Sequence, residues 1–309
     1  MLEIMLGLIM LLGGIFIMRY GLKKALWRRL HMALEKLTQT PWRALTLGTA
    51  AAAAFQSSTT VSLVTIGLVS ADYMSFRQAL GVILGANIGT CSTLQLVNMS
   101  VSLDYILPLI LLSVLISGLR KKFRYIGLAL TGLLSMFAGL EFLMNGISSL
   151  SKMDAMTGYL VMAKSQPLYG IWGGLIATVV FQSSSAATAL LMLLADMGLV
   201  DSTTSAYVIY GNNIGSCISS VVFSAAAPIA ARRVALSHIL LNVVGVAFFY
   251  PLTAVLVSAA GYLTSDFGAQ VAAIHTIFNI LSSLLVMPQF NQFVNLICLL
   301  IPDRRKGAD

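Results

Sequence analysis

The sequence predicts an all-α integral membrane protein built from two inverted-topology repeats, each with a re-entrant helix hairpin and a broken transmembrane helix. Composition predicts the membrane class, because 58% of the 309 residues are apolar and only 10% are charged. Soluble domains have roughly 45–50% apolar and 25% charged residues. The repeats are predicted by two uncharged polar motifs that each occur twice within apolar sequence.

The duplicated motifs are separated by one constant offset. The chain carries QSSTT at residues 56–60 and QSSSA at 182–186; it also carries GANIGTC at 85–91 and GNNIGSC at 211–217. The offset of 126 residues holds without a gap from Pro41 to Cys91. Duplicated polar interruptions of membrane-spanning sequence are the best sequence indication of a transporter's binding site.

Apolar stretches define the expected spans, since a helix needs about 20 apolar residues to cross a bilayer. The expected spans are 2–18, 76–97, 103–119, 125–148, 204–226, 234–257 and 270–287. Segments 42–71 and 167–197 each carry a QSS motif at the middle, and their halves are too short to span. We therefore expect each segment to be a re-entrant hairpin with the QSS motif at its tip.

The expected organisation is a single transmembrane transport domain over residues 1–309. Its first repeat covers 1–124, with hairpin 42–71 and an odd span at 103–119 that inverts the second repeat. The second repeat covers 125–262 with hairpin 167–197, and C-terminal helices occupy 263–309. Residues 20–40 read as a separate amphipathic helix at the cytoplasmic interface.

The net charge of +8 reflects basic residues at the ends of apolar runs. If neither hairpin crosses, all 19 basic residues except Lys152 and Lys164 fall on one side. The positive-inside rule then places the N-terminus outside and the C-terminus in the cytoplasm of a plasma (inner) membrane protein. No basic stripe with interleaved aromatics is present, so nucleic acid is not an expected partner.

The hairpin tips have the chemistry of an anion site. A helix that begins after each QSS motif would present backbone N–H groups and the positive end of its dipole. Two tips arriving from opposite faces would surround one small oxyanion with neutral donors. Neither motif holds an Arg or Lys, and we expect a site without a fixed cation, which could bind the substrate too tightly for release.

The GxNIG(T/S)C motifs have two interpretations. Glycines around an Asn loosen a helix, and the oxygens of Asn87, Thr90, Asn213 and Ser216 would suit a small cation. The alternative is close helix packing by small residues. Glu141 is a further intramembrane candidate for binding a cation or for titration during transport; the alternatives are a paired structural residue or a side chain that reaches toward the outer interface. His238 and Asn242, like His275 and Asn279, favour hydrogen bonding between helices.

The paired motifs resemble those of the type II sodium-phosphate cotransporter family, including its bacterial members, over roughly residues 5–287. The resemblance implies sodium-driven symport of inorganic phosphate, with sodium as a coupling ion and no cofactor. It implies a phosphate set of Gln56, Ser57, Ser58, Gln182, Ser183 and Ser184. It implies a sodium set of Thr59, Asn87, Thr90, Ser185, Asn213 and Ser216.

The sequence departs from that family at three motif positions, with Thr59 for Ser, Ser216 for Thr and Asn212 for a small residue. Similar bacterial proteins often add a PhoU-like regulatory domain, and the chain ends at Asp309 without one. The partners expected are phosphate, sodium and the lipid bilayer, and a homodimer is left open.

Three alternatives remain at this stage. One is an exporter of phosphate, or a carrier of another small oxyanion, that is not coupled to sodium. The second is a channel, which ion flux would distinguish from a carrier. The third is an intramembrane serine protease, suggested by the HxxxN pattern, although no QSS serine has a histidine nearby in sequence. No GxxxxGK[ST] motif supplies an ATP-driven motor.

Overall fold

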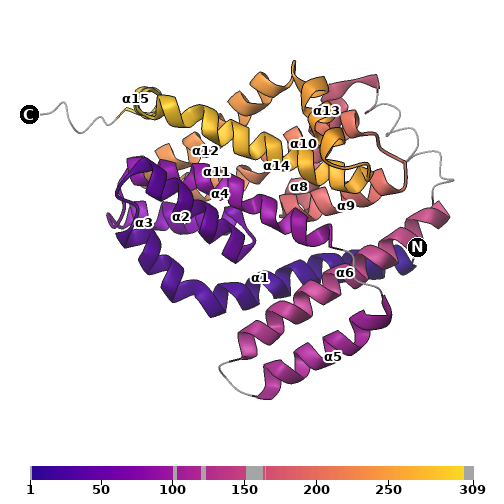
Figure 1. Cartoon of the computed structure of the whole chain (residues 1–309). Helices are drawn as coiled ribbons and strands as arrows, with labels where there is room; N and C mark the ends of the chain where they lie inside the picture. The colour runs from indigo at the N-terminus through magenta and orange to yellow at the C-terminus, as the bar shows by residue number, and fades with distance from the viewer. Residues whose placement is uncertain (1, 100–102, 120–122, 151–162, 164, 303–309) are drawn as a thin grey trace, which may run out of the picture. The chain divides into compact units, whose positions relative to one another are not determined.

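The computed structural model describes residues 2–99, 103–119, 123–150, 163 and 165–302, and within these ranges it is helical without a strand (Figure 1). Lys152 and Lys164 lie outside the described residues. The helices in chain order are α1 (Leu2–Lys36), α2 (Pro41–Phe55), α3 (Ser58–Ser70), α4 (Phe76–Val97), α5 (Leu103–Leu119), α6 (Arg124–Leu150), α8 (Pro167–Phe181), α9 (Ser184–Asp196), α10 (Ser202–Ser216), α11 (Ile218–Ser224), α12 (Ile229–Phe249), α13 (Thr253–Leu263), α14 (Phe267–Val286), the 3-10 helix η1 (Met287–Gln289) and α15 (Phe290–Leu300).

Five of the described helical segments are long and apolar enough to cross a membrane, which indicates a multi-pass membrane protein. They are Leu2–Trp27, Phe76–Val97, Arg124–Ile147, Ile229–Phe249 and Phe267–Leu300. Two predicted spans have the wrong bounds. Segment 204–226 is divided into α10 and α11, and segment 234–257 is interrupted around Pro251, which has no N–H to continue a helix.

The prediction of a separate surface helix at 20–40 is wrong, because α1 continues without a break from the first span to Lys36. The evenly spaced glycines of α1 and α6 explain why α1 can lie against α6. A Cβ at Gly14 would lie 2.5 Å from the backbone nitrogen of Met136, and one at Gly132 would overlap the backbone of Met18. The two helices therefore pack backbone to backbone along this glycine seam (Figure 1).

Each predicted hairpin contains two packed helices on either side of its QSS motif. In both repeats the first helix has 15 residues and the second has 13. Pro41 and Pro167 each begin the first helix, where a missing N–H is tolerated. The second helix ends in the same kind of turn, with positive φ at Asp72 (58°) and at Gly198 (71°).

The helices form two compact units, and each unit combines segments from both halves of the sequence. The first compact unit consists of Met1–Trp27, Thr93–Asn212 and Thr253–His275, and contains the hairpin α8–α9. The second compact unit consists of Arg28–Ser92, Asn213–Leu252 and Thr276–Asp309, and contains the hairpin α2–α3. Within the second unit, α3 packs against α11 and α12.

Candidate functional site

The two hairpin tips have the same backbone conformation. Gln56 has φ 53° and ψ 33°, and Gln182 has φ 53° and ψ 26°. The following serines are extended, with φ and ψ of −162° and 109° at Ser57 and of −160° and 110° at Ser183. A left-handed conformation is uncommon for a residue other than glycine. Its recurrence shows that the QSS motif forms one local structure in both repeats.

Each tip is also the capped start of a helix. The hydroxyl of Ser57 accepts a hydrogen bond from the N–H of Thr60 at 3.1 Å, and that of Ser183 accepts one from the N–H of Ala186 at 3.2 Å. Serine is favoured as an N-cap because its oxygen satisfies one of the exposed helix N–H groups. The remaining N–H groups and the helix dipole favour a negatively charged ligand.

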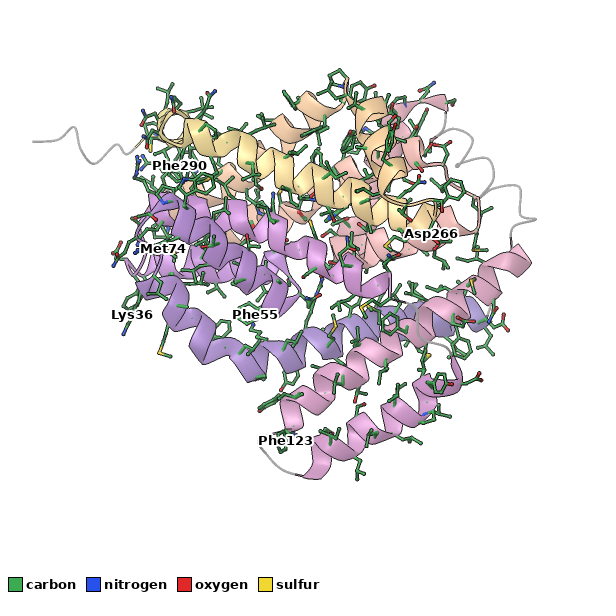
Figure 2. The ribbon with its side chains drawn as sticks, viewed as in Figure 1. Lys36, Phe55, Met74, Phe123, Asp266 and Phe290 are labelled. Atoms are coloured by element: carbon green, nitrogen blue, oxygen red, sulfur yellow. The ribbon has the colours of Figure 1, made fainter. Side chains whose placement is uncertain are left out.

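The first tip is held by the side chain of its glutamine. The Gln56 amide nitrogen donates to the carbonyl of Ala53 at 2.5 Å and to the hydroxyl of Ser92 in α4 at 3.0 Å. All three members of this QSS motif are buried. Figure 2 labels Phe55, the residue that ends α2 just before the tip.

The second tip is held by different contacts. The amide of Asn212 in α10 donates to the hydroxyl of Thr188 in α9 at 2.9 Å and accepts from the hydroxyl of Thr178 in α8 at 3.1 Å. Asn212 thus clamps both arms of this hairpin to α10. The same positions of the first repeat hold Ala52, Ser62 and Ala86, so the clamp is absent there.

A cationic side chain reaches the second tip, contrary to the expectation of a site without one. The Nη2 atom of Arg19 in α1 donates to the hydroxyl of Ser185 at 3.1 Å. Sequence reasoning grouped Arg19 with the cytoplasmic basic residues because it directly follows an apolar run. Arg19 lies inside the candidate span Leu2–Trp27, but so do Lys23 and Lys24, so no sequence signal distinguished Arg19 from these neighbours.

The glycines of the GxNIG(T/S)C motifs act in packing. A Cβ at Gly85 would overlap the carbonyl oxygen of Leu45, and one at Gly211 would overlap that of Ile171. Each glycine therefore allows its helix to approach the first helix of a hairpin. The predicted break is wrong for the first motif, because α4 runs through it, whereas in the second repeat the helix is interrupted at Cys217.

Polar side chains in the second compact unit join the two motifs. Asn87 in α4 donates to the side-chain oxygen of Asn242 at 3.4 Å, and Asn242 donates to the sulfur of Cys217 at 3.1 Å. The sulfur of Cys217 lies 3.4 Å from the carbonyl oxygen of Asn213. The predicted hydrogen bonding between helices by Asn242 is confirmed.

The residues of the predicted sodium set lie mainly in this unit. Thr59, Asn87, Thr90, Asn213 and Ser216 belong to the second compact unit, and Ser185 belongs to the first. The hydroxyl of Thr90 donates to the carbonyl of Ala86 at 2.8 Å, and that of Ser216 donates to the carbonyl of Asn213 at 2.7 Å. A hydroxyl that donates its proton keeps its oxygen lone pairs, so both remain chemically suited to a cation.

Comparison with known proteins bears on what these tips do. A model of the family described as Na+/Pi-cotransporter matches residues 10–145 and again residues 143–279. The chain belongs to this family. The two consecutive matches of one family model agree with the duplication of the motifs.

Two curated relatives extend this finding. "Uncharacterized protein YqeW" of Bacillus subtilis (strain 168) is 27% identical over 293 residues, which cover 94% of this chain and 95% of that protein. "Putative inorganic phosphate export protein YjbB" of Escherichia coli (strain K12) is 24% identical over 291 residues. These cover 93% of this chain and 53% of that protein, so the chain spans about half the length of the second relative. No solved structure matches the chain.

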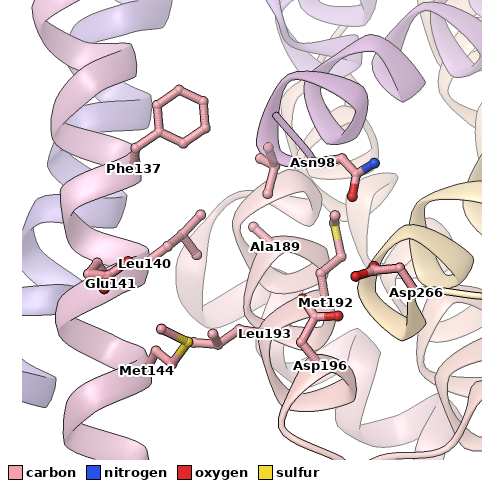
Figure 3. A pocket seen from close by; sticks show the side chains of 11 residues that line it. Asn98, Phe137, Leu140, Glu141, Met144, Ala189, Met192, Leu193, Asp196 and Asp266 are labelled. Atoms are coloured by element: carbon pink, nitrogen blue, oxygen red, sulfur yellow. The ribbon is translucent and has the colours of Figure 1, made fainter. Parts of the chain in front are cut away.

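Glu141 lines a cavity of about 300 Å³ in the first compact unit of this Na+/Pi-cotransporter family member (Figure 3). Residues of α6 and α9 form much of the wall, and Asp196 and Asp266 add two further carboxylates. The cavity brings Glu141 together with acidic residues that the sequence separates widely. Its predicted role in cation binding or titration is untested by this arrangement.

The Na+/Pi-cotransporter family is a family of transporters, so the protease alternative is wrong for this chain. The structure does place a serine beside a histidine of one HxxxN segment. The hydroxyl of Ser220 lies 3.4 Å from Nδ1 of His238, but both residues are fully buried. A nucleophilic serine must meet its substrate, and this pair instead links α11 to α12.

Proposed function

We propose that this chain carries inorganic phosphate across the plasma membrane in symport with sodium, by alternating access. The observation that carries the proposal is the pair of QSS tips, which share one capped, left-handed turn in both repeats. Membership of the Na+/Pi-cotransporter family supports phosphate as the substrate and sodium as the coupling ion. No nucleotide motif supplies an alternative source of energy.

Each tip binds phosphate through neutral donors in this proposal. The contributing residues are Gln56, Ser57, Ser58, Gln182, Ser183 and Ser184. Hydroxyl and amide groups join the N–H groups at the start of α3 and α9, where the helix dipole favours negative charge. Donors of this kind bind an oxyanion and still allow its release, which a transport cycle requires.

Sodium binds in this proposal to side-chain oxygens drawn from Thr59, Asn87, Thr90, Ser185, Asn213 and Ser216. Asn87→Ala should shift the sodium dependence of uptake before the phosphate dependence. Asn242→Ala is the matched control, because it removes the hydrogen bond to Asn87 while leaving the Asn87 oxygen. Equal shifts in both variants would assign Asn87 a packing role and remove it from the sodium set.

Inverted repeats and re-entrant hairpins complete the proposal. The N-terminus then lies outside and the C-terminus in the cytoplasm. Single cysteines placed beside Arg43 and beside Arg77 should both react with an impermeant thiol reagent only from the cytoplasmic side. Labelling of the two positions from opposite sides would overturn this topology.

The direct test is radiolabelled phosphate uptake into proteoliposomes that contain the purified chain. An inward sodium gradient is compared with a matched potassium gradient. Uptake with sodium alone supports the symporter, and equal uptake with either cation would remove the coupling role of sodium. No uptake with either cation would contradict the proposal.

Phosphate export without sodium coupling is a second candidate. It is favoured by the printed name of the Escherichia coli relative, "Putative inorganic phosphate export protein YjbB". Proteoliposomes preloaded with phosphate distinguish the two candidates. Efflux that is independent of external and internal sodium would favour the exporter, whereas efflux that requires internal sodium would favour the symporter running in reverse.

A further inference from the structure

A cavity of about 310 Å³ lies in the second compact unit, where α12, α14, η1 and α15 form its wall. Most of the wall is apolar, and Phe248, Leu285 and Leu296 are wall residues whose side chains are exposed at the surface. Because α12 and α14 belong to candidate membrane spans, lipid is the medium that meets this surface. Ligand pockets have volumes of about 300–1,000 Å³. The cavity can therefore accept an apolar group from the bilayer.

One polar side chain lies within this apolar wall. Ser282 of α14 is 3% exposed, and its hydroxyl has no hydrogen-bond partner among the described residues. It lies against Gly245 of α12, where a Cβ would be 2.8 Å from the Ser282 Oγ atom. A buried hydroxyl without a partner is unfavourable. An acceptor that enters the cavity removes this cost once the hydroxyl rotates to another staggered position.

Two amides give the cavity a polar rim. Gln289 and Gln292 lie on the face of η1 and α15 that also presents Leu296 to the cavity, at helical spacing. Both glutamines are exposed, so their N–H groups can donate to a ligand that extends out of the cavity. An apolar interior with one hydroxyl and a rim of amides fits an amphiphile that has a hydrocarbon chain and ester oxygens.

Two arginines flank α15. Arg77 of α4 donates to the side-chain oxygen of Asn291, and its guanidinium lies 5.8 Å from the ring centroid of Phe290. At the other end of α15, Arg233 of α12 donates to the carbonyl of Ile301 at 3.0 Å. Both acceptors are neutral groups, so these contacts do not neutralise either positive charge. Basic side chains near the ends of membrane spans attract anionic lipid headgroups.

We propose that this cavity binds an anionic glycerophospholipid of the bilayer. One acyl chain fills the apolar interior, and an ester oxygen accepts the hydrogen bond of Ser282. The amides of Gln289 and Gln292 contact the glycerol region, and the arginines that flank α15 attract the headgroup. A lipid bound in this way joins α15 to α12 and α14. The site takes no part in the proposed transport of phosphate.

Native mass spectrometry of the purified chain in a non-ionic detergent tests the proposal. The probes are dioleoyl phosphatidylglycerol, which is anionic, and dioleoyl phosphatidylcholine, which has the same acyl chains and no net charge. We expect one phosphatidylglycerol to bind per chain, about tenfold or more tightly than phosphatidylcholine. Arg77→Gln and Arg233→Gln should each reduce this preference about fivefold, which is the effect of one basic side chain on an anionic lipid.

Variants of the wall test the position of the lipid. Ser282→Ala should weaken binding about threefold to tenfold, because one hydrogen bond is lost. Ser283→Ala is the matched control, because Ser283 is also buried and without a partner among the described residues but does not line the cavity. Leu296→Trp obstructs the cavity from an exposed position and should abolish binding. Val244→Trp, at another exposed wall position, replaces it if Leu296→Trp does not elute as a folded protein.

Three results would overturn the proposal. The first is a series of lipid adducts of similar affinity that the tryptophan variant leaves unchanged, which would show only a non-specific lipid shell. The second is equal affinity for the two lipids, or equal effects of Ser282→Ala and Ser283→Ala. The third is a dimer that forms without lipid and is lost in the tryptophan variant, which would show that a second copy of the chain covers the cavity. Phosphate uptake tests the proposed function separately.

Discussion

The two hairpins share one turn but are anchored by different side chains. In the first hairpin, the tip glutamine reaches across to Ser92 in α4. In the second, Gln182 donates only within its own turn, to the carbonyl of Val179 at 2.7 Å, among the contacts that the structure describes. There the Asn212 clamp and Arg19 hold the hairpin instead.

This comparison separates what the motif encodes from what its surroundings add. The turn needs a residue that tolerates positive φ followed by a side chain that caps a helix, and both are local properties of the QSS sequence. The anchors are long-range contacts that differ between the repeats. The two tips can therefore have similar ligand chemistry and yet different stability and charge.

Removal of the cap serines is expected to have the largest effect on transport. Ser57→Ala and Ser183→Ala should each raise the KM for phosphate by about tenfold to a hundredfold, because a hydrogen bond to a charged group is worth about 1.5–3 kcal/mol. Uptake kinetics in proteoliposomes measure this change. Similar effects at both positions would show that the common turn, and not the different anchors, determines phosphate binding.

Glycine substitutions separate the two roles of each serine. Gly is nearly as good an N-cap as Ser, whereas Ala at an N-cap destabilises by about 0.5–2 kcal/mol. If the hydroxyl contacts phosphate, Ser57→Gly and Ser183→Gly should impair uptake as strongly as the alanine variants. Normal uptake by the glycine variants would reduce the serines to helix caps.

Loss of the clamp is expected to destabilise only the second hairpin. Asn212→Ala leaves the hydroxyl of Thr178 without its acceptor in a buried position, which destabilises by about 1–3 kcal/mol. Thermal unfolding in detergent should show a lower Tm. The double variant Thr178→Ala/Asn212→Ala reproduces the residues of the first repeat, and it should be less destabilised than the sum of its single variants. Strict additivity would show that the two side chains are not coupled.

The contrast also shows which parts of the molecule a sequence can predict. The two helices on either side of each QSS motif and the turn between them follow from local propensities, and the structure contains them. The continuity of α4 does not, because Gly85 serves a backbone contact with Leu45 that belongs to another helix. The contact of Arg19 depends in the same way on the rotation of α1 against α9.

Some errors could have been avoided with the sequence alone. Pro251 lies within the predicted span 234–257, and a proline inside a helix is a strong indication of a break. The equal spacing of glycines in α1 and α6 is a second such signal, because small residues along a membrane helix favour close packing against a neighbouring helix.

A buried hydroxyl provides a smaller test of the same comparison. Among the described residues, the Ser62 hydroxyl in α3 has no hydrogen-bond partner, whereas its counterpart Thr188 is held by Asn212. Ser62→Ala should stabilise the chain by about 0.5–1 kcal/mol, because an unsatisfied buried polar group is removed. Thr188→Ala should destabilise it by about 1 kcal/mol. Shifts of the same sign in thermal unfolding would show that the two positions do not differ as the structure indicates.

The ends of the two hairpins differ in their response to pH, and this is the smallest effect we expect. The second hairpin ends at Asp196, outside the five candidate spans, where the first has Ser70. The carboxylate of Asp196 accepts the N–H of Gly268 at 2.5 Å. Partial desolvation raises its pKa above the usual value, as does the neighbouring Asp266, while the Gly268 N–H opposes the rise.

A raised pKa in the folded state means that ionisation of Asp196 is easier in the unfolded chain. Its contribution to stability is therefore greatest at acidic pH and declines as the pH rises through the folded pKa. Asp196→Asn keeps an acceptor for Gly268 and cannot ionise, so its Tm should exceed that of the wild-type chain at pH 7 and converge with it near pH 4. Asp201→Asn is the control, because Asp201 caps α10 through the N–H of Thr204 at 2.8 Å and asparagine caps equally well. The prediction is contradicted if the Tm of the wild-type chain does not fall below the Tm of Asp196→Asn as the pH rises. The carboxyl of Asp196 would then be fully hydrated at the end of the second hairpin.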